Sequence, residues 1–223
     1  MPLYNPSSNS STGSNNRGLY TIPDMPALST FGQVNISGTA SAIENSGKAI
    51  TIVDTEPTFQ SIHLNGLTKV IPAATPYRIS ILALLNAQNV GYWGFAFGWT
   101  DGIKFDICSQ QGGETFCHPL FSDANTRVSA GDNVCALPMM QGALWLGLRD
   151  DGSNIYFEFS LDGANYTTIV TSTKAAGYLS TNGYTSIFFG LFNGNYTYPT
   201  PSGNALSASF LAYDENGLTR FAG

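Results

Sequence analysis

The stretch "LWLGLRDDGSNIYFEFSLDGANYTTI", residues 144–169, constrains the fold more than any other part of the chain. Apolar residues alternate with polar or small ones on both sides of the Asp-Asp-Gly break, which is the period of a β-strand with one buried face. The Asp-Gly pairs at 151–152 and 162–163 favour the tight turns of β-hairpins. The segment therefore predicts a meander of three antiparallel strands. Its buried face would carry Leu144, Leu146, Leu148, Ile155, Phe157, Phe159 and Leu161.

Similar runs follow one another from residue 31 to the C-terminus, and none of them has convincing helical spacing. In "YWGFAFGWT", residues 92–100, large aromatic residues occupy one face and small residues the other, so another layer can approach closely. "GIKFDIC" predicts that Phe105 and Ile107 point inward and that Asp106 points outward. Many short strands without helices between them predict an all-β chain that folds as an antiparallel β-sandwich.

The first thirty residues form a separate segment with a different composition. "MPLYNPSSNSSTGSNNRG" is rich in Ser, Asn, Gly and Pro, and such a tract cannot bury enough apolar area to fold alone. Two interpretations stay open: a disordered tail, or an extended arm that becomes ordered against a partner. The expected organisation is an arm over residues 1–30 and a sandwich over residues 31–223. The candidate docking residues of the arm are Tyr4, Leu19, Tyr20 and Ile22.

Composition excludes several classes of protein. Charged residues make up 11% of the chain, against about 25% in an average soluble domain. The net charge is -6 and the nine basic residues are scattered, so nucleic acid is not expected as a partner. The N-terminus has neither the basic nor the apolar region of a signal peptide, and the apolar runs are too short to cross a membrane. A weakly charged, polar surface with 24 glycines is typical of particle-exposed or extracellular β proteins.

Two segments of the chain resemble a known family. Residues 144–169 are similar to the "W-L-x-L-R-D-D-G-x-N" hairpins of concanavalin-A-like lectin/glucanase jelly rolls. "TSIFFGLFN" and "ALSASFLAYDE", at 185–193 and 205–215, resemble the last two strands of these domains. Such domains are frequent at the C-terminal end of tailed-bacteriophage virion proteins, and "MPLYNPSS" resembles the start of phage tail and fibre proteins. The resemblance implies an extended arm followed by a jelly-roll sandwich.

The resemblance also implies a role and partners. The expected protein is a virion structural component made in the host cytoplasm and exposed on the particle as a head decoration, short fibre or tail fibre. Its arm would dock onto other capsid or tail proteins, and the sandwich would self-associate as a homotrimer. The main alternative is an adhesin that binds host surface glycans, and a carbohydrate-active hydrolase is a weaker alternative. One fold hosts many functions, so these alternatives stay open.

Catalytic motifs are not evident in the sequence. Glucanases of this family carry an E-x-D-x-x-E strand whose carboxylates act as nucleophile and acid/base. The nearest match is Glu158 and Asp162, where the order is wrong and a turn falls at the second residue. The two histidines, His63 and His118, have no G-x-S-x-G elbow to serve. We therefore expect no catalytic residues and a non-enzymatic protein, with His63 on the surface of a strand.

The strongest ligand-binding candidate is the loop "NGNYTYPTPSGN". Asn195, Tyr196 and Tyr198 combine an amide with aromatic rings on which sugars stack. The competing interpretation, which we place ahead, is a surface loop stiffened by its prolines or a contact to a neighbouring subunit.

Metal and cofactor binding are not expected. Cys108, Cys117, Cys135 and His118 are the right residue types for zinc, but their spacing matches no known finger. An odd number of cysteines also argues against a complete disulfide framework, so buried thiols are the favoured interpretation. The acidic turn with Asp150, Asp151 and Asn154 could hold calcium through its oxygen atoms, although backbone geometry explains such a turn without a metal, so both interpretations stay open.

Overall fold

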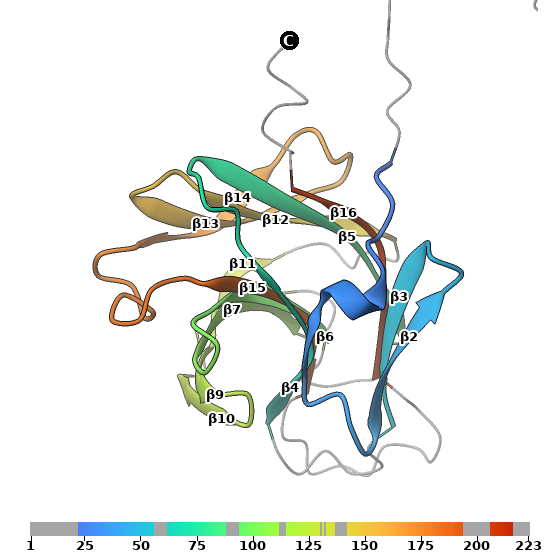
Figure 1. Cartoon of the computed structure of the whole chain (residues 1–223). Coiled ribbons are helices and arrows are strands. Elements are labelled where there is room, and N and C mark those ends of the chain that lie inside the picture. Colours follow the sequence, from blue (N-terminus) through green and yellow to red (C-terminus); the bar gives the residue numbers. More distant parts are fainter. Residues whose placement is uncertain are drawn as a thin grey trace, which may run out of the picture.

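The structure, a computed structural model, describes residues 22–55, 62–87, 94–111, 115–129, 131, 133–136, 142–193 and 206–215. Two sheets face each other, and each strand pairs with its neighbours antiparallel (Figure 1). This arrangement confirms the predicted all-β, antiparallel β-sandwich of jelly-roll type. In the described part of the chain, the one helical element is the short 3-10 turn η1, Leu28–Thr30.

The two sheets contain sixteen strands in the described residues. Sheet A has the order β1 (Gly32–Val34), β4 (His63–Val70), β15 (Ser186–Asn193), β6 (Gly94–Thr100), β7 (Phe105–Gln111), β8 (Thr115–Cys117) and β11 (Asn133–Ala136), with β9 (Leu120–Asp123) and β10 (Thr126–Ser129) attached through β7. Sheet B has the order β14 (Thr167–Thr173), β13 (Asn154–Ser160), β12 (Leu144–Asp150), β5 (Tyr77–Ala87), β16 (Leu206–Asp214), β3 (Ala49–Asp54) and β2 (Ala40–Asn45).

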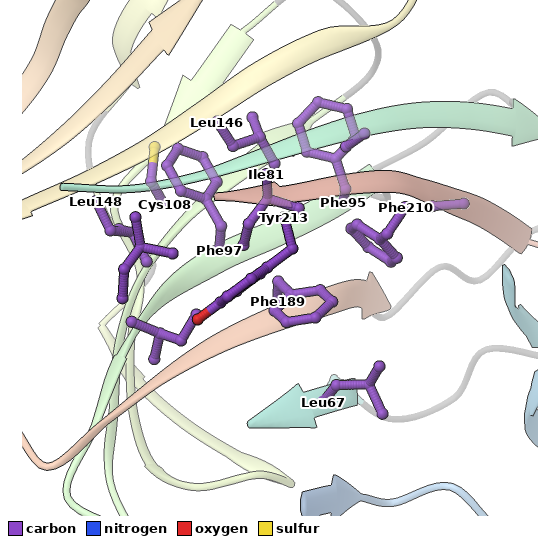
Figure 2. Packing of buried hydrophobic residues seen from close by; sticks show 14 of the residues in the cluster. Leu67, Ile81, Phe95, Phe97, Cys108, Leu146, Leu148, Phe189, Phe210 and Tyr213 are labelled. Atoms are coloured by element: carbon purple, nitrogen blue, oxygen red, sulfur yellow. The ribbon is translucent and has the colours of Figure 1, made fainter. Parts of the chain in front are cut away.

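The main hydrophobic core fills the space between the two sheets. Sheet B contributes the leucines of β12, as the alternation of the meander predicted, and sheet A contributes alternate residues of β6 and β15. Figure 2 shows Phe189 of sheet A lying near Phe210 and Tyr213 of sheet B, and the rings of Phe189 and Phe210 meet edge to face at 4.9 Å. Burying aromatic side chains of this size is a large part of what stabilises such a sandwich.

Sheet A is strongly curled, and small residues on its outer face permit the curl. A Cβ atom on Gly190 would lie 2.2 Å from the carbonyl oxygen of Asn65, and one on Gly98 would lie 2.2 Å from that of Asp106. Neighbouring strands can lean together this closely only where no side chain intervenes. The alternation of aromatic and small residues in β6 therefore builds the core on one face and the curvature on the other.

A second hydrophobic cluster fills the concave outer face of sheet A. Its aromatic members are Phe105, Phe121, Phe188 and Phe192, each at most 3% exposed. The hairpin β9–β10 lies at the end of the curl in Figure 1, and Leu64 donates its backbone N–H to the carbonyl of Ala124 in that hairpin at 2.8 Å. Asn35 adds a side-chain hydrogen bond to Asn125 at 2.8 Å. Sheet A is thus buried on both faces.

The N-terminal part of the described chain already belongs to the sandwich. Met25 and Phe31 are 3% and 7% exposed and lie in the main core, whereas Ile22 is 60% exposed. Packing therefore begins within the segment predicted as the arm, several residues before residue 31. Tyr4, Leu19 and Tyr20 lie outside the described residues, so docking through the arm stays a prediction.

Candidate functional site

A group of charged and aromatic side chains covers the outer face of sheet B. At its centre Glu158 of β13 accepts hydrogen bonds from the Nε atoms of Arg78 and Arg149, both at 2.9 Å and one to each carboxylate oxygen. These residues come from three neighbouring strands, because β12 pairs with β13 on one side and with β5 on the other. Thr168 of β14 also contacts the carboxylate, with its Oγ1 3.4 Å from Oε1.

Two tyrosine rings stack against the two arginines. The guanidinium carbon of Arg149 lies 3.5 Å from the ring centre of Tyr156, and that of Arg78 lies 4.5 Å from the ring centre of Tyr166. Both rings are only partly buried. Arginine stacks well on aromatic faces because its guanidinium is planar and weakly hydrated. The result is a row in which Tyr156, Arg149, Glu158, Arg78 and Tyr166 hold one another in place.

Close backbone contacts fix the aromatic rings on this face. A Cβ atom on Gly147 would lie 2.9 Å from the Tyr166 ring, so this ring covers β12 where the strand has no side chain. Trp145, partly buried, lies against the β13–β14 turn, since a Cβ atom on Gly163 would lie 2.8 Å from its indole. Gly163 has φ +73, a conformation that favours glycine. The second Asp-Gly turn of the opening motif therefore positions two of the three rings.

We refer to Trp145, Tyr156, Tyr166, Arg78, Arg149 and Glu158 as the arginine–tyrosine face. Burial raises the pKa of Tyr166, so this hydroxyl stays protonated at neutral pH. Burial alone would lower the pKa of Arg149, but the hydrogen bond and charge of Glu158 outweigh burial and raise it. Arg149 thus remains cationic, and the hydroxyl of Tyr166 remains a hydrogen-bond donor.

Glu158 and Asp162, the nearest sequence match to a glucanase carboxylate pair, do not form such a pair. Glu158 is 2% exposed and both of its oxygens bind arginines. Asp162 sits in the β13–β14 turn, where Oδ1 accepts the backbone N–H groups of Ala164 and Asn165 at 2.8 Å each. These hydrogen bonds hold the pKa of Asp162 well below its usual range. One carboxylate anchors arginines and the other caps a turn.

A second polar cluster bridges the two sheets at one end of the sandwich. Asp54 of β3 accepts hydrogen bonds from Asn65 at 2.6 Å and from Asn193, and its Oδ2 lies 3.2 Å from Nε2 of His63. His63 is 9% exposed, so its predicted place on the surface is wrong. The alternation of "SIHLN" gave the correct period but the wrong face, because in sheet A both faces are buried.

This cluster marks where the predicted ligand loop begins and ends. Asn193, the last residue of β15, binds Asp54, and Leu206, the first residue of β16, is the register partner of Asp54. Asn195, Tyr196 and Tyr198 lie between them, outside the described residues. A sugar-binding role for these three residues stays a prediction.

The other histidine also pairs with a buried aspartate. Nε2 of His118 lies 2.6 Å from Oδ1 of Asp106, which is 1% exposed and faces the space between the sheets. Cys108 belongs to the main core, whereas Cys117 is the register partner of Ser109 and so faces the other side of sheet A. Burial raises the pKa of the Cys117 thiol. The two cysteines and His118 therefore do not converge as zinc ligands would.

Protein donors surround the acidic turn that was considered for calcium. Oδ1 of Asp151 accepts backbone N–H groups from Ser153 and Asn154, and Oδ2 accepts the hydroxyl of Tyr156 at 2.6 Å. Asp150 binds the ammonium of Lys174 at 2.7 Å. These contacts account for the turn without a metal. In the described residues, no group of three or more His, Cys, Asp or Glu side chains is arranged to hold an ion, and no helix is long and apolar enough to cross a membrane.

Comparison with known proteins informs the fold. No protein-family model and no curated protein sequence matches the chain. Among solved structures, the Bacteroides ovatus xyloglucan-system protein GH43B matches with a TM-score of 0.51 and 15% identity, over 86% of this chain and 38% of that one. A Saccharomyces cerevisiae protein of unknown function matches with a TM-score of 0.49 and 12% identity, over 84% of this chain and 96% of that one. A Bacteroides ovatus mixed-linkage-glucan GH16 enzyme matches with a TM-score of 0.49 and 10% identity, over 79% of this chain and 84% of that one.

These neighbours correct one sequence-based prediction. The prediction of a non-enzymatic protein is contradicted, because the sandwich occurs in GH43B, a glycoside hydrolase of family 43. The missing E-x-D-x-x-E strand excluded one catalytic arrangement and not catalysis as such. At these identities the likeness establishes the fold alone, and this chain spans well under half of the GH43 proteins it matches.

Proposed function

We propose that the chain is a carbohydrate-recognition protein displayed on the surface of a tailed-bacteriophage particle. The observation that carries the recognition part is the arginine–tyrosine face, where Trp145, Tyr156 and Tyr166 keep part of their rings exposed beside hydrogen-bonding groups. Pyranose rings stack their apolar faces on aromatic side chains, while polar groups bind their hydroxyls. Because the rings are held by stacking and close contacts, little conformational entropy is lost on binding.

The shared fold supports this proposal in part. The GH43B protein that has the same sandwich comes from a xyloglucan system, so a β-sandwich of this shape occurs in proteins that handle polysaccharides. The concave outer face of sheet A offers no competing surface among the described residues, because the second hydrophobic cluster and the β9–β10 hairpin fill it. Recognition is therefore assigned to the outer face of sheet B.

The particle-surface part of the proposal rests on composition and on the resemblance of the N-terminus. A polar surface with few charges resists non-specific adsorption, and an arm that orders on binding wraps a large area of its mount. On this proposal residues 1–21 dock onto a capsid or tail protein, and the sandwich projects as a homotrimer. Mass spectrometry of purified particles, with and without a deletion of residues 1–21, tests docking. Retention of the shortened protein on particles would contradict it.

Glycan binding is tested with the full chain on an array of bacterial surface polysaccharides. We expect binding that is lost in Trp145→Ala and kept in Tyr178→Ala, a partly buried tyrosine in the β14–β15 connection. The double variant Tyr196→Ala/Tyr198→Ala tests the loop outside the described residues. Loss of binding in that variant, with Trp145→Ala unaffected, would move the site to the loop. Reducing ends measured in the same samples report any hydrolysis.

A further inference from the structure

Two arginines lie side by side on the arginine–tyrosine face. Arg78 of β5 and Arg149 of β12 are direct register partners, a placement that brings two positive charges together on neighbouring strands. Like charges directly opposite each other destabilise a sheet unless a counter-charge separates them. Glu158 supplies that counter-charge, and it binds both arginines through Nε alone. Both of these hydrogen bonds use Nε, so the terminal nitrogens lie beyond the contact with Glu158, and the Arg149 guanidinium also hydrogen-bonds Tyr156.

The solvent side of this group is positive. The side chain of Glu158 is 3% exposed, while those of Arg78 and Arg149 are 15% and 23% exposed, so the negative charge is buried beneath the positive ones. Two other carboxylates lie nearby. Asp214, beyond Ser80 on β16, is 8% exposed, and the oxygens of Asp151 are taken up by its own turn and by Tyr156. The carboxylates of Glu158 and Asp214 are buried, so the charged groups that this face itself offers to a ligand are the two guanidiniums.

We propose that the arginine–tyrosine face binds acidic polysaccharide, with a sugar carboxylate held between Arg78 and Arg149 and pyranose rings stacked on Trp145 and Tyr166. This inference rests on the proposed carbohydrate recognition and adds the class of sugar. Arginine is suited to the task because its planar fork matches the two oxygens of a carboxylate. The fixed pair is an exception in a chain of net charge -6, which otherwise repels polyanions.

The experiment compares one polymer in two charge states. Binding of the full chain to polygalacturonate and to its carboxyl-reduced form is measured by affinity electrophoresis and calorimetry. We expect the carboxylated polymer to bind at least about tenfold more tightly, with affinity falling as salt is raised, because partly exposed charges are screened. Equal binding of the two polymers would overturn the inference.

Variants separate the arginine pair from general effects of charge. Arg149→Ala is expected to weaken binding of polygalacturonate at least about tenfold, and Arg149→Lys less, since lysine keeps the charge but not the fork. The matched control is Lys174→Ala, which also removes a cation from a buried carboxylate of sheet B, that of Asp150, but away from this face. Trp145→Ala removes a stacking ring without changing any charge and is expected to weaken the binding of both polymers alike.

Each outcome decides something. If Arg149→Ala and Lys174→Ala lose the same affinity, the arginine pair is not the carboxylate site. If neutral polysaccharides bind and acidic ones do not, carbohydrate recognition stands and the acidic class is wrong. If no polysaccharide binds, both fail. Thermal unfolding shows whether each variant is folded. If Arg149→Ala is not folded, the affinity of Arg149→Lys and the binding of the two polymers to the unaltered protein test the inference instead.

Discussion

The outer face of sheet A is buried, whereas the outer face of sheet B is accessible. That of sheet A curls inward and is filled by phenylalanine rings under the β9–β10 hairpin, while that of sheet B stays open and carries charged and partly exposed aromatic side chains. Both faces are rich in aromatic residues, so the residue type does not distinguish them. The difference lies in curvature and in the turn sequences, which fold one hairpin over sheet A and set one turn beside Trp145. The outer face of sheet A therefore adds to the stability of the sandwich, and the outer face of sheet B remains accessible for contact.

The largest expected effect tests the closed face. Phe188→Ala removes a fully buried ring from the second cluster, where Phe188 meets Phe105 at 5.4 Å, and we expect the free energy of unfolding to fall by about 3–5 kcal/mol. Tyr156→Ala removes a ring of similar size from the open face and should cost only about 1–2 kcal/mol, because it stays partly hydrated. Urea unfolding measures both. Equal losses would mean that the two faces do not differ as described.

The next largest loss of stability is expected for Glu158→Gln. It leaves Arg78 and Arg149 facing each other without a counter-charge, and we expect a loss of about 1–3 kcal/mol, less than for a fully buried pair because both arginines reach solvent. Glu215→Gln is the matched control, since its ion pair with Lys69 is exposed and worth at most about 1 kcal/mol. If Glu158→Gln lowers the free energy of unfolding no more than the control does, Glu158 does not organise the arginine–tyrosine face.

Alkaline pH offers a finer test. Burial raises the pKa of Tyr166 on the open face and raises that of Tyr184 in the core to about 12. An unfolded tyrosine loses its proton near pH 10, so above about pH 10 the unfolded chain binds fewer protons than the folded one. The free energy of unfolding should therefore fall as pH rises through this window, by up to about 1.4 kcal/mol per pH unit for each such tyrosine. Tyr166→Phe should reduce the slope, and an unchanged slope would show that this ring is solvated.

The smallest expected effect concerns the closure of sheet A. Asn125→Ala removes one hydrogen bond between the β9–β10 hairpin and Asn35, and we expect a loss of about 0.5–1 kcal/mol with no change in the buried core. Hydrogen exchange at the Leu64 amide, which binds Ala124, should speed up more than exchange within β12. Uniform acceleration would indicate that the hairpin is not a separate closure.

The two faces also show where sequence reasoning succeeds. The strands β12 and β13 were predicted closely, because the inner face of sheet B is apolar and the outer face polar, so period two fixes both. Leu161, predicted on the buried face, is 65% exposed in the turn after β13. Sheet A is buried on both sides, and there the same period is ambiguous. Phe105 and Ile107 belong to the second cluster, and Asp106, predicted to point outward, faces the interior with His118.

The arginine–tyrosine face was only half visible in the sequence. Alternation placed Arg149 and Glu158 on the wet face of the meander, and the turn residues around Gly163 were recognised. Arg78 lies more than sixty residues before Arg149 in the sequence. The residues around Arg78 do not predict that β5 pairs with β12 in the register that brings the two arginines together. The register between distant strands depends on how the whole sheet assembles, so the pattern of one segment cannot predict it.

The anchoring of the first described residues has a mechanical consequence. Phe31 meets the rings of Phe189 and Tyr213 edge to face, at 5.4 and 5.8 Å, and β1 follows it directly along the outermost strand position of sheet A. A load applied at the N-terminal end of the described chain therefore reaches the buried side chains of Met25 and Phe31 before it reaches the first strand. Under tension at this end, the Phe31 ring would have to leave the core first. The three-residue strand β1 would then separate from β4.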